Sequence, residues 1–338
     1  MKSSPTPPRP RRPYRRALAA LALAGIALSG AGIAAARTEN AHYLTADGAI
    51  RIGGAEHVRF IVERVNALYA KAHPGTRFQM ESKGTTSAIP LLTYGVTLFG
   101  AMGREIDPLE SASFAKTVGA PPLEIRVAHT SNDTSQHLAT SLAVYVNRAN
   151  PIDRLTTAQI ARIFAQGNPG GDYSRWGQLG LDKDWKSRLI HPIGTPEYTG
   201  FGTYMQKYQL AGRPLAAGYE AYGDTDAILE RLEQDPAGIA VAAIGRETPA
   251  LKQVAVATDP NGPYTLGTPE EVTAGTYAYG RYLYFYLRRE PGKPLDPVVK
   301  AYMRLVLSPE GQAIMASQAK GYIPLTAAEA KAELAKLD

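Results

Sequence analysis

Two kinds of hydrophobic spacing alternate along the chain after residue 48. Short runs rich in β-forming residues, such as 49–54, 125–128 and 238–243, have the length of β-strands. Between such runs, residues 58–69 repeat apolar side chains at intervals of three and four, which is typical of one face of an α-helix. The alternation predicts an α/β fold, with a largely parallel sheet at the start of the chain.

The same criteria predict the other elements. Further strands are expected at residues 76–81, 94–102, 141–146, 190–194, 254–256 and 281–287. A charged helix is expected at the C-terminus, and other helices near residues 85–93, 155–164, 199–205, 227–232, 297–307 and 309–318. Five tyrosines lie at close spacing between residues 277 and 286, which predicts a packed strand face, with a carbohydrate-stacking surface as the alternative.

Two junctions between a predicted strand and a predicted helix carry glycine together with hydroxyl residues. One is the Lys-Gly-Thr-Thr-Ser segment at 83–87, and the other is the Thr/Gly-rich segment at 195–203. The first N–H groups of a helix lack partners and carry partial positive charge, so each junction is a candidate anion site. Hydroxyl residues at a helix start are also ordinary N-caps, and the sequence of one junction alone does not separate the two roles.

Residues 1–36 differ in kind from the rest of the chain. A basic start without acidic residues is followed at 17–36 by an uncharged run rich in alanine, leucine and glycine. This pattern is typical of an export signal and predicts cleavage after Ala36, which makes the protein periplasmic or secreted. A retained membrane anchor is the alternative, because 20 uncharged residues can span a bilayer. The Arg11-Arg12 pair leaves both the Sec and the twin-arginine export routes open.

The leader also accounts for the net charge of the chain. The whole sequence has 37 basic and 31 acidic residues, and six of the basic ones precede residue 37, so the remainder is formally neutral. The sequence pI near 9.3 therefore does not indicate a nucleic-acid partner. The absence of cysteine excludes disulfides, thiolate metal sites and a lipid-modified cysteine after the leader.

Candidate catalytic groups are few. Ser131, Asp133 and His137 are close in sequence, but they lie in a polar segment without a nucleophile elbow, so a hydrolytic triad is not expected. The six histidines show no metal-binding spacing, and no glycine-rich nucleotide loop is present. We therefore expect no enzymatic activity, no metal and no cofactor.

Several blocks of sequence, taken in order, resemble one known family. They are residues 52–57, 83–89, 144–151, 155–164, 198–201, 235–240, 281–284 and, most specifically, 307–312 with 321–325. In this order they resemble the phosphate-binding component of bacterial phosphate ABC importers, a periplasmic binding protein of the two-lobed type II. The resemblance covers approximately residues 49–325, nearly all of the chain after the leader.

The resemblance implies two α/β lobes joined by two hinge crossings, with the ligand held between them. Residues 42–139 and 279–338 would form lobe one, and residues 140–278 would form lobe two. The ligand would be phosphate or a similar oxyanion, the partner an ABC permease, and the protein a monomer. The implied ligand-binding residues are Thr85, Thr86, Ser87, Arg104, Thr199, Gly200, Phe201, Ala55, Glu56 and His57.

The chain departs from the family at these same loops. Ala55 and Phe201 stand where the family has hydroxyl residues, Gly103 stands in place of a serine, and Thr195 in place of an arginine. The family's acidic residue is also absent from segment 98–100. Each missing donor costs about 0.5–1.5 kcal/mol, so an oxyanion other than phosphate stays open.

Less specific roles stay open for some of these residues. Arg104 either clamps an oxyanion or pairs with Glu105 or Asp107, and His57 either contacts the ligand or packs near a helix start. Glu56 is either a ligand contact or an acid that complements a helix dipole. The alternative function is a divergent binding-fold protein that acts as a sensor, adaptor or surface interaction module without transport.

Overall fold

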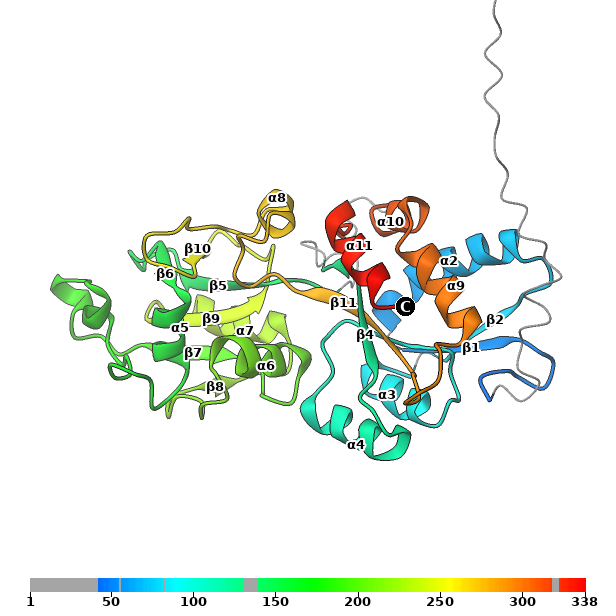
Figure 1. Ribbon diagram of the computed structural model, residues 1–338. Coiled ribbons are helices and arrows are strands. Elements are labelled where there is room, and N and C mark those ends of the chain that lie inside the picture. The colour runs from blue at the N-terminus through cyan, green and yellow to red at the C-terminus, as the bar shows by residue number, and fades with distance from the viewer. Residues whose placement is uncertain (1–41, 55, 82, 131–138, 318–321) are drawn as a thin grey trace, which may run out of the picture.

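The computed structural model describes residues 42–54, 56–81, 83–130, 139–317 and 322–338. The chain forms two α/β lobes, each built around one β-sheet (Figure 1). The predicted leader lies outside the described residues, and so do Ser131, Asp133 and His137. Within the described ranges, no helix combines the length and apolar character needed to cross a bilayer.

The sheet of lobe one has five strands in the order β2-β1-β3-β11-β4. These strands are Phe78–Glu81, Ile50–Gly54, Gly100–Met102, Tyr282–Leu287 and Leu123–His129, respectively. β1 pairs in parallel with β2 and β3, whereas β11 runs antiparallel to β3 and β4. β1, β2, β3 and β4 therefore all run in one direction, as predicted for a largely parallel sheet, and β11, which enters the sheet from the other lobe, runs against them (Figure 1).

Helices cover both faces of this sheet. They are α2 (Arg59–Ala72), α3 (Thr85–Thr93), α4 (Pro108–Val118), α9 (Pro297–Val306), α10 (Pro309–Met315) and α11 (Ala327–Ala335), with a short 3-10 helix, η1, at Glu56–Val58. The sequence analysis did not predict α4, although Asp107 and Glu110 form a capping box at its start and Gly119 ends it in a left-handed conformation. The predicted strand at 94–102 is shorter than expected and begins only at Gly100.

The sheet of lobe two has six strands in the order β6-β10-β5-β9-β7-β8. These strands are Arg154–Thr156, Leu251–Ala257, Leu142–Asn147, Gly238–Ala243, His191–Gly194 and Glu220–Ala221. The helical elements are α5 (Thr157–Phe164), η2 (Trp176–Leu179), η3 (Lys183–Trp185), α6 (Gly200–Tyr204), a π-helical turn, η4 (Met205–Gln209), α7 (Thr225–Glu233) and α8 (Pro269–Thr273). Thr156 caps α5, because its hydroxyl accepts from the Gln159 N–H at 3.1 Å.

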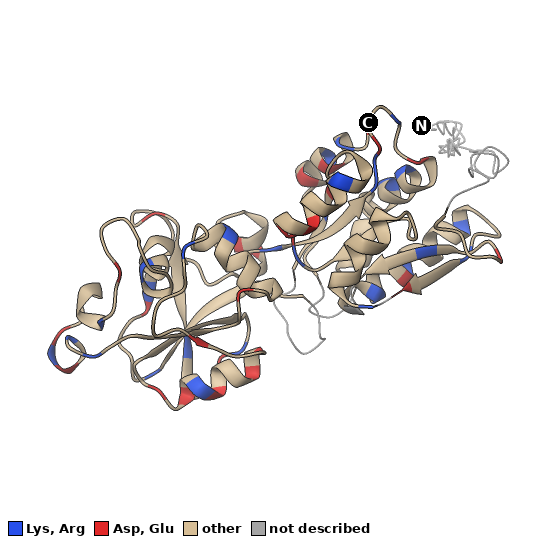
Figure 2. Cartoon of the chain, turned by 90° about the horizontal axis from the view of Figure 1, so that it is seen from below, with Lys and Arg blue, Asp and Glu red and all other residues tan. Residues whose placement is uncertain are grey.

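The segments that cross between the lobes bond to each other. The Thr130 N–H donates to the Arg281 carbonyl at 3.0 Å, and the Leu142 N–H donates to the Tyr279 carbonyl at 3.3 Å. Two separate stretches of chain thus run side by side at the junction of the lobes. Basic and acidic residues are interspersed along the helices of both lobes (Figure 2).

The closely spaced tyrosines are packing residues, as predicted. Tyr277 and Tyr279 belong to the core of lobe two, and Tyr284 and Tyr286 are buried on β11 in lobe one. The Tyr284 and Tyr286 rings stack with centroids 6.0 Å apart, and the Tyr286 hydroxyl donates to Glu124 at 2.8 Å. Their burial excludes the carbohydrate-stacking alternative for these side chains.

Candidate ligand-binding cleft

A cleft with a volume of about 460 Å³ lies between the two lobes. This volume is within the range of small-molecule sites. Lobe one and the crossings contribute His57, Thr85, Thr86, Gly103, Arg104, Ala139, Thr140 and Arg281. Lobe two contributes Thr195, Tyr198, Thr199, Gly200, Phe201, Gly223, Asp224 and Thr225. Both predicted strand-to-helix junctions therefore open into the same cleft.

On the lobe-one side, α3 begins directly at the cleft. Its N-cap is Gly84, which has φ +86° and provides no side-chain cap. The N–H groups of Thr85 and Thr86, in the first turn, have no intrahelical acceptor and are available to a ligand. Ser87 behaves differently: its hydroxyl donates back to the Gly84 carbonyl at 2.7 Å, and it does not line the cleft. The prediction that Ser87 contacts the ligand therefore has no geometric support.

On the lobe-two side, Thr199 caps α6 with its side chain. The hydroxyl accepts from the Gly202 N–H at 3.0 Å and lies 2.8 Å from the Pro196 carbonyl, to which it donates. Because these bonds occupy the hydroxyl, the donors left for a ligand are the N–H groups of Gly200 and Phe201. The sequence located this junction correctly, but the hydroxyl of Thr199 serves the helix.

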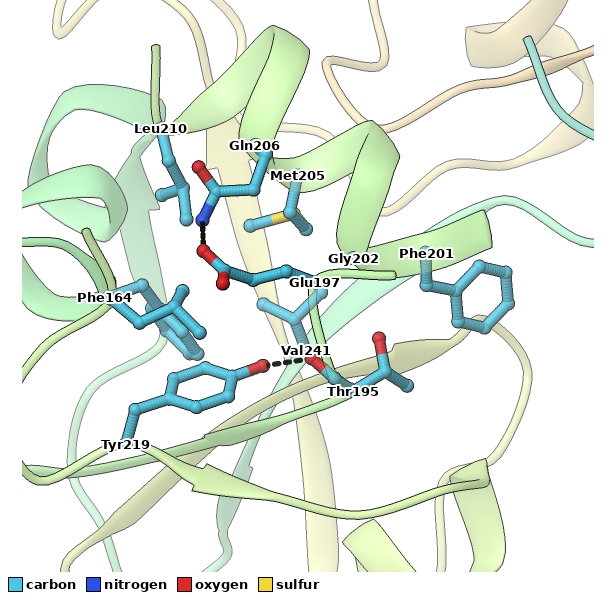
Figure 3. Close-up of a pocket in the computed structure, with 11 residues that line it drawn as sticks. Phe164, Thr195, Glu197, Phe201, Gly202, Met205, Gln206, Leu210, Tyr219 and Val241 are labelled. Atoms are coloured by element: carbon cyan, nitrogen blue, oxygen red, sulfur yellow. Dashed lines mark hydrogen bonds between the residues drawn. The ribbon is translucent and has the colours of Figure 1, made fainter. Parts of the chain in front are cut away.

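Close packing behind α6 fixes this junction (Figure 3). The Tyr219 hydroxyl donates to the Thr195 carbonyl at 2.7 Å, and the Gln206 amide donates to the Glu197 carboxylate at 2.7 Å. A Cβ atom on Gly202 would lie 2.0 Å from the Pro196 carbonyl oxygen, so only glycine fits there. The space enclosed behind the junction has a volume of about 10 Å³, too small for a phosphate-sized ligand.

Arg104 lines the cleft with its charge already balanced. Its guanidinium forms two hydrogen bonds to the Glu110 carboxylate, at 2.7 and 2.8 Å, and one to the Glu105 carbonyl at 2.9 Å. The partner is therefore Glu110, which forms the capping box of α4 with Asp107, and neither of the two carboxylates considered from the sequence. The Glu105 carboxylate instead forms an ion pair across the lobes with Lys207.

His57 and Gly103 occupy the lobe-one wall together. A Cβ atom on Gly103 would lie 2.0 Å from His57 Nε2, so the imidazole fills the space that a side chain at 103 would need. The backbone of His57 is held by the Tyr322 hydroxyl, which donates to its carbonyl at 2.9 Å. Of the other predicted residues in this loop, Ala55 lies outside the described residues, and Glu56 is described only as the first residue of η1.

The sequence analysis missed Arg281, a buried charged residue that lines the cleft. Its side chain donates to the Thr140 carbonyl and to the Gly103 carbonyl, both at 2.9 Å, and only 5% of the residue is exposed. The guanidinium lies 5.0 Å from the centre of the Phe201 ring. Burial lowers the pKa of Arg281, and the neighbouring charge of Arg104 acts in the same direction. In the sequence, the local sign of this site is an arginine at the start of an aromatic run.

Asp224 was missed as well, and it brings an acceptor into the cleft. It is the N-cap of α7, and its Oδ1 accepts from the Ala227 N–H at 2.9 Å. A carboxylate at this position can accept a proton from a hydrogen-bearing ligand and repels one that has only acceptor oxygens. Among the residues that the structure describes, no group of three or more histidine or carboxylate side chains is placed to hold a metal ion.

The comparisons with known proteins agree with this geometry. A family model described as a PBP superfamily domain matches residues 39–310. The chain belongs to this superfamily. The phosphate-binding protein PstS of Pseudomonas aeruginosa PAO1 is 29% identical over 272 residues, covering 80% of each chain. PstS of Staphylococcus epidermidis RP62A is 24% identical over 280 residues, covering 82% of this chain and 78% of the relative.

Solved structures show the same fold. An ABC-type phosphate transport receptor from Vibrio cholerae has a TM-score of 0.55 at 18% identity, covering 81% of this chain and 99% of the other. PstS from Borrelia burgdorferi has a TM-score of 0.56 at 17% identity, covering 82% and 98%. The resemblance to periplasmic phosphate-binding proteins and the two-lobed type II fold predicted from the sequence are thereby confirmed.

Proposed function

We propose that the protein is an exported solute-binding protein that captures phosphate or a related small oxyanion between its lobes and delivers it to an ABC importer. The observation that carries this proposal is the convergence of two helix starts, α3 and α6, on one cleft from separate lobes. The names of the relatives, phosphate-binding protein and phosphate transport receptor, support phosphate as the first ligand to test.

The donors around the cleft suit an oxyanion. Backbone N–H groups of Thr85, Thr86, Gly200 and Phe201 provide hydrogen bonds without full counter-charges. A desolvated anion needs several such donors, because each of its oxygens loses water on binding. Donors on two lobes also make ligand binding and lobe closure one event, which a permease can recognise.

The proposed ligand contacts are a subset of the residues predicted from the sequence. They are His57, Thr85, Thr86, Arg104, Gly200 and Phe201, with Thr199 as the cap that positions the last two. We place the hinge where the crossings pass from residues 42–139 to 140–278 and back to 279–338. The protein would act as a monomer outside the inner membrane, after cleavage of the leader near Ala36.

Isothermal titration calorimetry of the chain without its leader tests this function. Phosphate, sulfate and glycerol phosphate are titrated separately, and we expect saturable one-to-one binding of phosphate. Ser87→Ala is the matched control, because this hydroxyl does not line the cleft and its loss leaves the affinity unchanged. No heat and no thermal stabilisation with any of the three anions would overturn the proposal and favour a sensor or adaptor role.

A further inference from the structure

Arg281 is a buried cation whose described hydrogen bonds go only to neutral groups. Its two acceptors are the carbonyls of Thr140 and Gly103, and its ring neighbours are Phe201 at 5.0 Å and Tyr204 at 5.6 Å. No ion pair to Arg281 is found within the described part of the chain, although its side chain lines the cleft. A buried charge without a counter-charge destabilises the folded protein, so the burial of the Arg281 guanidinium needs an explanation.

The neighbouring Arg104 differs from Arg281, because a carboxylate balances its charge. Glu110 accepts two hydrogen bonds from Arg104, at 2.7 and 2.8 Å, and neutralises it within lobe one. Arg281 has the same guanidinium group, but among the described residues no carboxylate accepts a hydrogen bond from it. Of the two arginines that line the cleft, Arg281 is thus the one without a carboxylate partner among the described residues.

Arg281 lies where the two lobes meet, close to the start of α6. A Cβ atom on Gly200, at the start of α6, would lie 3.9 Å from Arg281 Nη2 and 3.6 Å from Arg104 Cδ. The backbone carbonyl of Arg281 accepts from the Thr130 N–H at 3.0 Å, which ties its strand to the other crossing. The Thr140 and Gly103 carbonyls hold the guanidinium in place before any ligand enters, and a donor held in this way loses little entropy on binding.

We propose that Arg281 is a ligand-binding residue whose missing counter-ion is the captured oxyanion. A guanidinium carries five N–H groups, and the described hydrogen bonds use two of them. The remaining donors suit the oxygens of a tetrahedral anion in the cleft. The inference rests on the proposed function and sharpens it: the site selects solutes with at least one full negative charge and rejects neutral polar solutes of the same size.

Two substitutions at this position test the role of the charge. Arg281→Met removes the cation and keeps an apolar stem, and we expect it to lower phosphate affinity at least one-hundredfold in calorimetry. Arg281→Lys keeps the charge but loses the planar donor set, so its affinity falls between the two. Arg126→Met is the matched control, because Arg126 pairs with Glu333 away from the cleft; it lowers the melting temperature without changing the affinity.

The outcomes separate this inference from the function on which it rests. Phosphate binding by the unmodified protein, together with an Arg281→Met affinity within threefold of it, overturns the role of Arg281 and leaves the function intact. No binding by the unmodified protein overturns both. If Arg281→Met does not fold, Arg281→Lys decides: an affinity equal to that of the unmodified protein contradicts the proposal, and a loss of tenfold or more supports it.

Discussion

The two faces of the cleft are built from the same kind of junction but are prepared in opposite ways. On the lobe-one face, α3 starts at a glycine without a side-chain cap, so its first N–H groups stay open. On the lobe-two face, the Thr199 hydroxyl caps the five-residue α6, and Tyr219 holds the preceding turn. A hydroxyl residue at a helix start therefore marks an open donor site in one lobe and a closed structural support in the other.

The difference assigns separate tasks to the two lobes. The first N–H groups of α3 gain most from an anion, because they have no intrahelical acceptor. The α6 junction is close-packed at Gly202, and it brings the backbone of Gly200 and Phe201 to the cleft. Substitutions in lobe two should then act mainly on stability, and substitutions at the start of α3 mainly on affinity.

The largest effect is expected at Gly202. A Cβ atom there would approach the Pro196 carbonyl oxygen to 2.0 Å, whereas at Gly200 the nearest atom would be 3.6 Å away. Gly202→Ala should lower the free energy of unfolding by about 3 kcal/mol, at the upper end of the usual cost of overpacking. Urea denaturation measures this, with Gly200→Ala as the matched control. Equal stability of the two variants would show that the turn before α6 is not close-packed.

A smaller loss is expected on the lobe-one wall, where His57 and Gly103 share one space. Gly103→Ala places a Cβ atom 2.0 Å from His57 Nε2 and should cost about 2 kcal/mol in urea denaturation. The same substitution in a His57→Ala background should cost less than half as much, because the imidazole no longer occupies the space. Additive effects in this double-mutant cycle would contradict the shared space.

The contrast also explains how far the sequence alone predicts the site. Both junctions were found from local signals, because glycine and hydroxyl residues at a helix start are adjacent in the chain. The roles of Thr199 and Ser87 could not be predicted in this way, because they depend on the hydrogen bonds that each hydroxyl forms in the folded protein. Arg281 was missed because its partner Gly103 is 178 residues away, and a charge within a strand pattern is usually exposed.

Comparison of the sequence with the family pattern also misses Arg281. Thr195 stands where the family has an arginine, which from the sequence reads as the loss of a cation at the ligand site. In the structure, Arg281 lies directly before β11, on the second crossing between the lobes, and lines the same cleft. The cleft therefore keeps a guanidinium on another element, and only the folded arrangement reveals it.

Affinity should respond most clearly at Thr85, the first residue of α3. Thr85→Pro removes one open N–H group, while proline is well accepted at the first position of a helix. Loss of one hydrogen bond to a charged ligand costs about 1.5–3 kcal/mol, so phosphate affinity should fall at least about tenfold in calorimetry. The melting temperature without ligand should stay within a few degrees. An unchanged affinity would remove α3 from the site.

The smallest effect is expected at Thr199, where the sequence points to a ligand donor and the geometry to a cap. Thr199→Ala removes the hydrogen bond to the Gly202 N–H and should lower the free energy of unfolding by about 1 kcal/mol. Phosphate affinity should change by less than about threefold, because the neighbouring N–H groups remain. Thr199→Ser, which keeps the hydroxyl, should restore the stability. A tenfold loss of affinity with unchanged stability would reverse the assignment and make the two faces of the cleft equivalent.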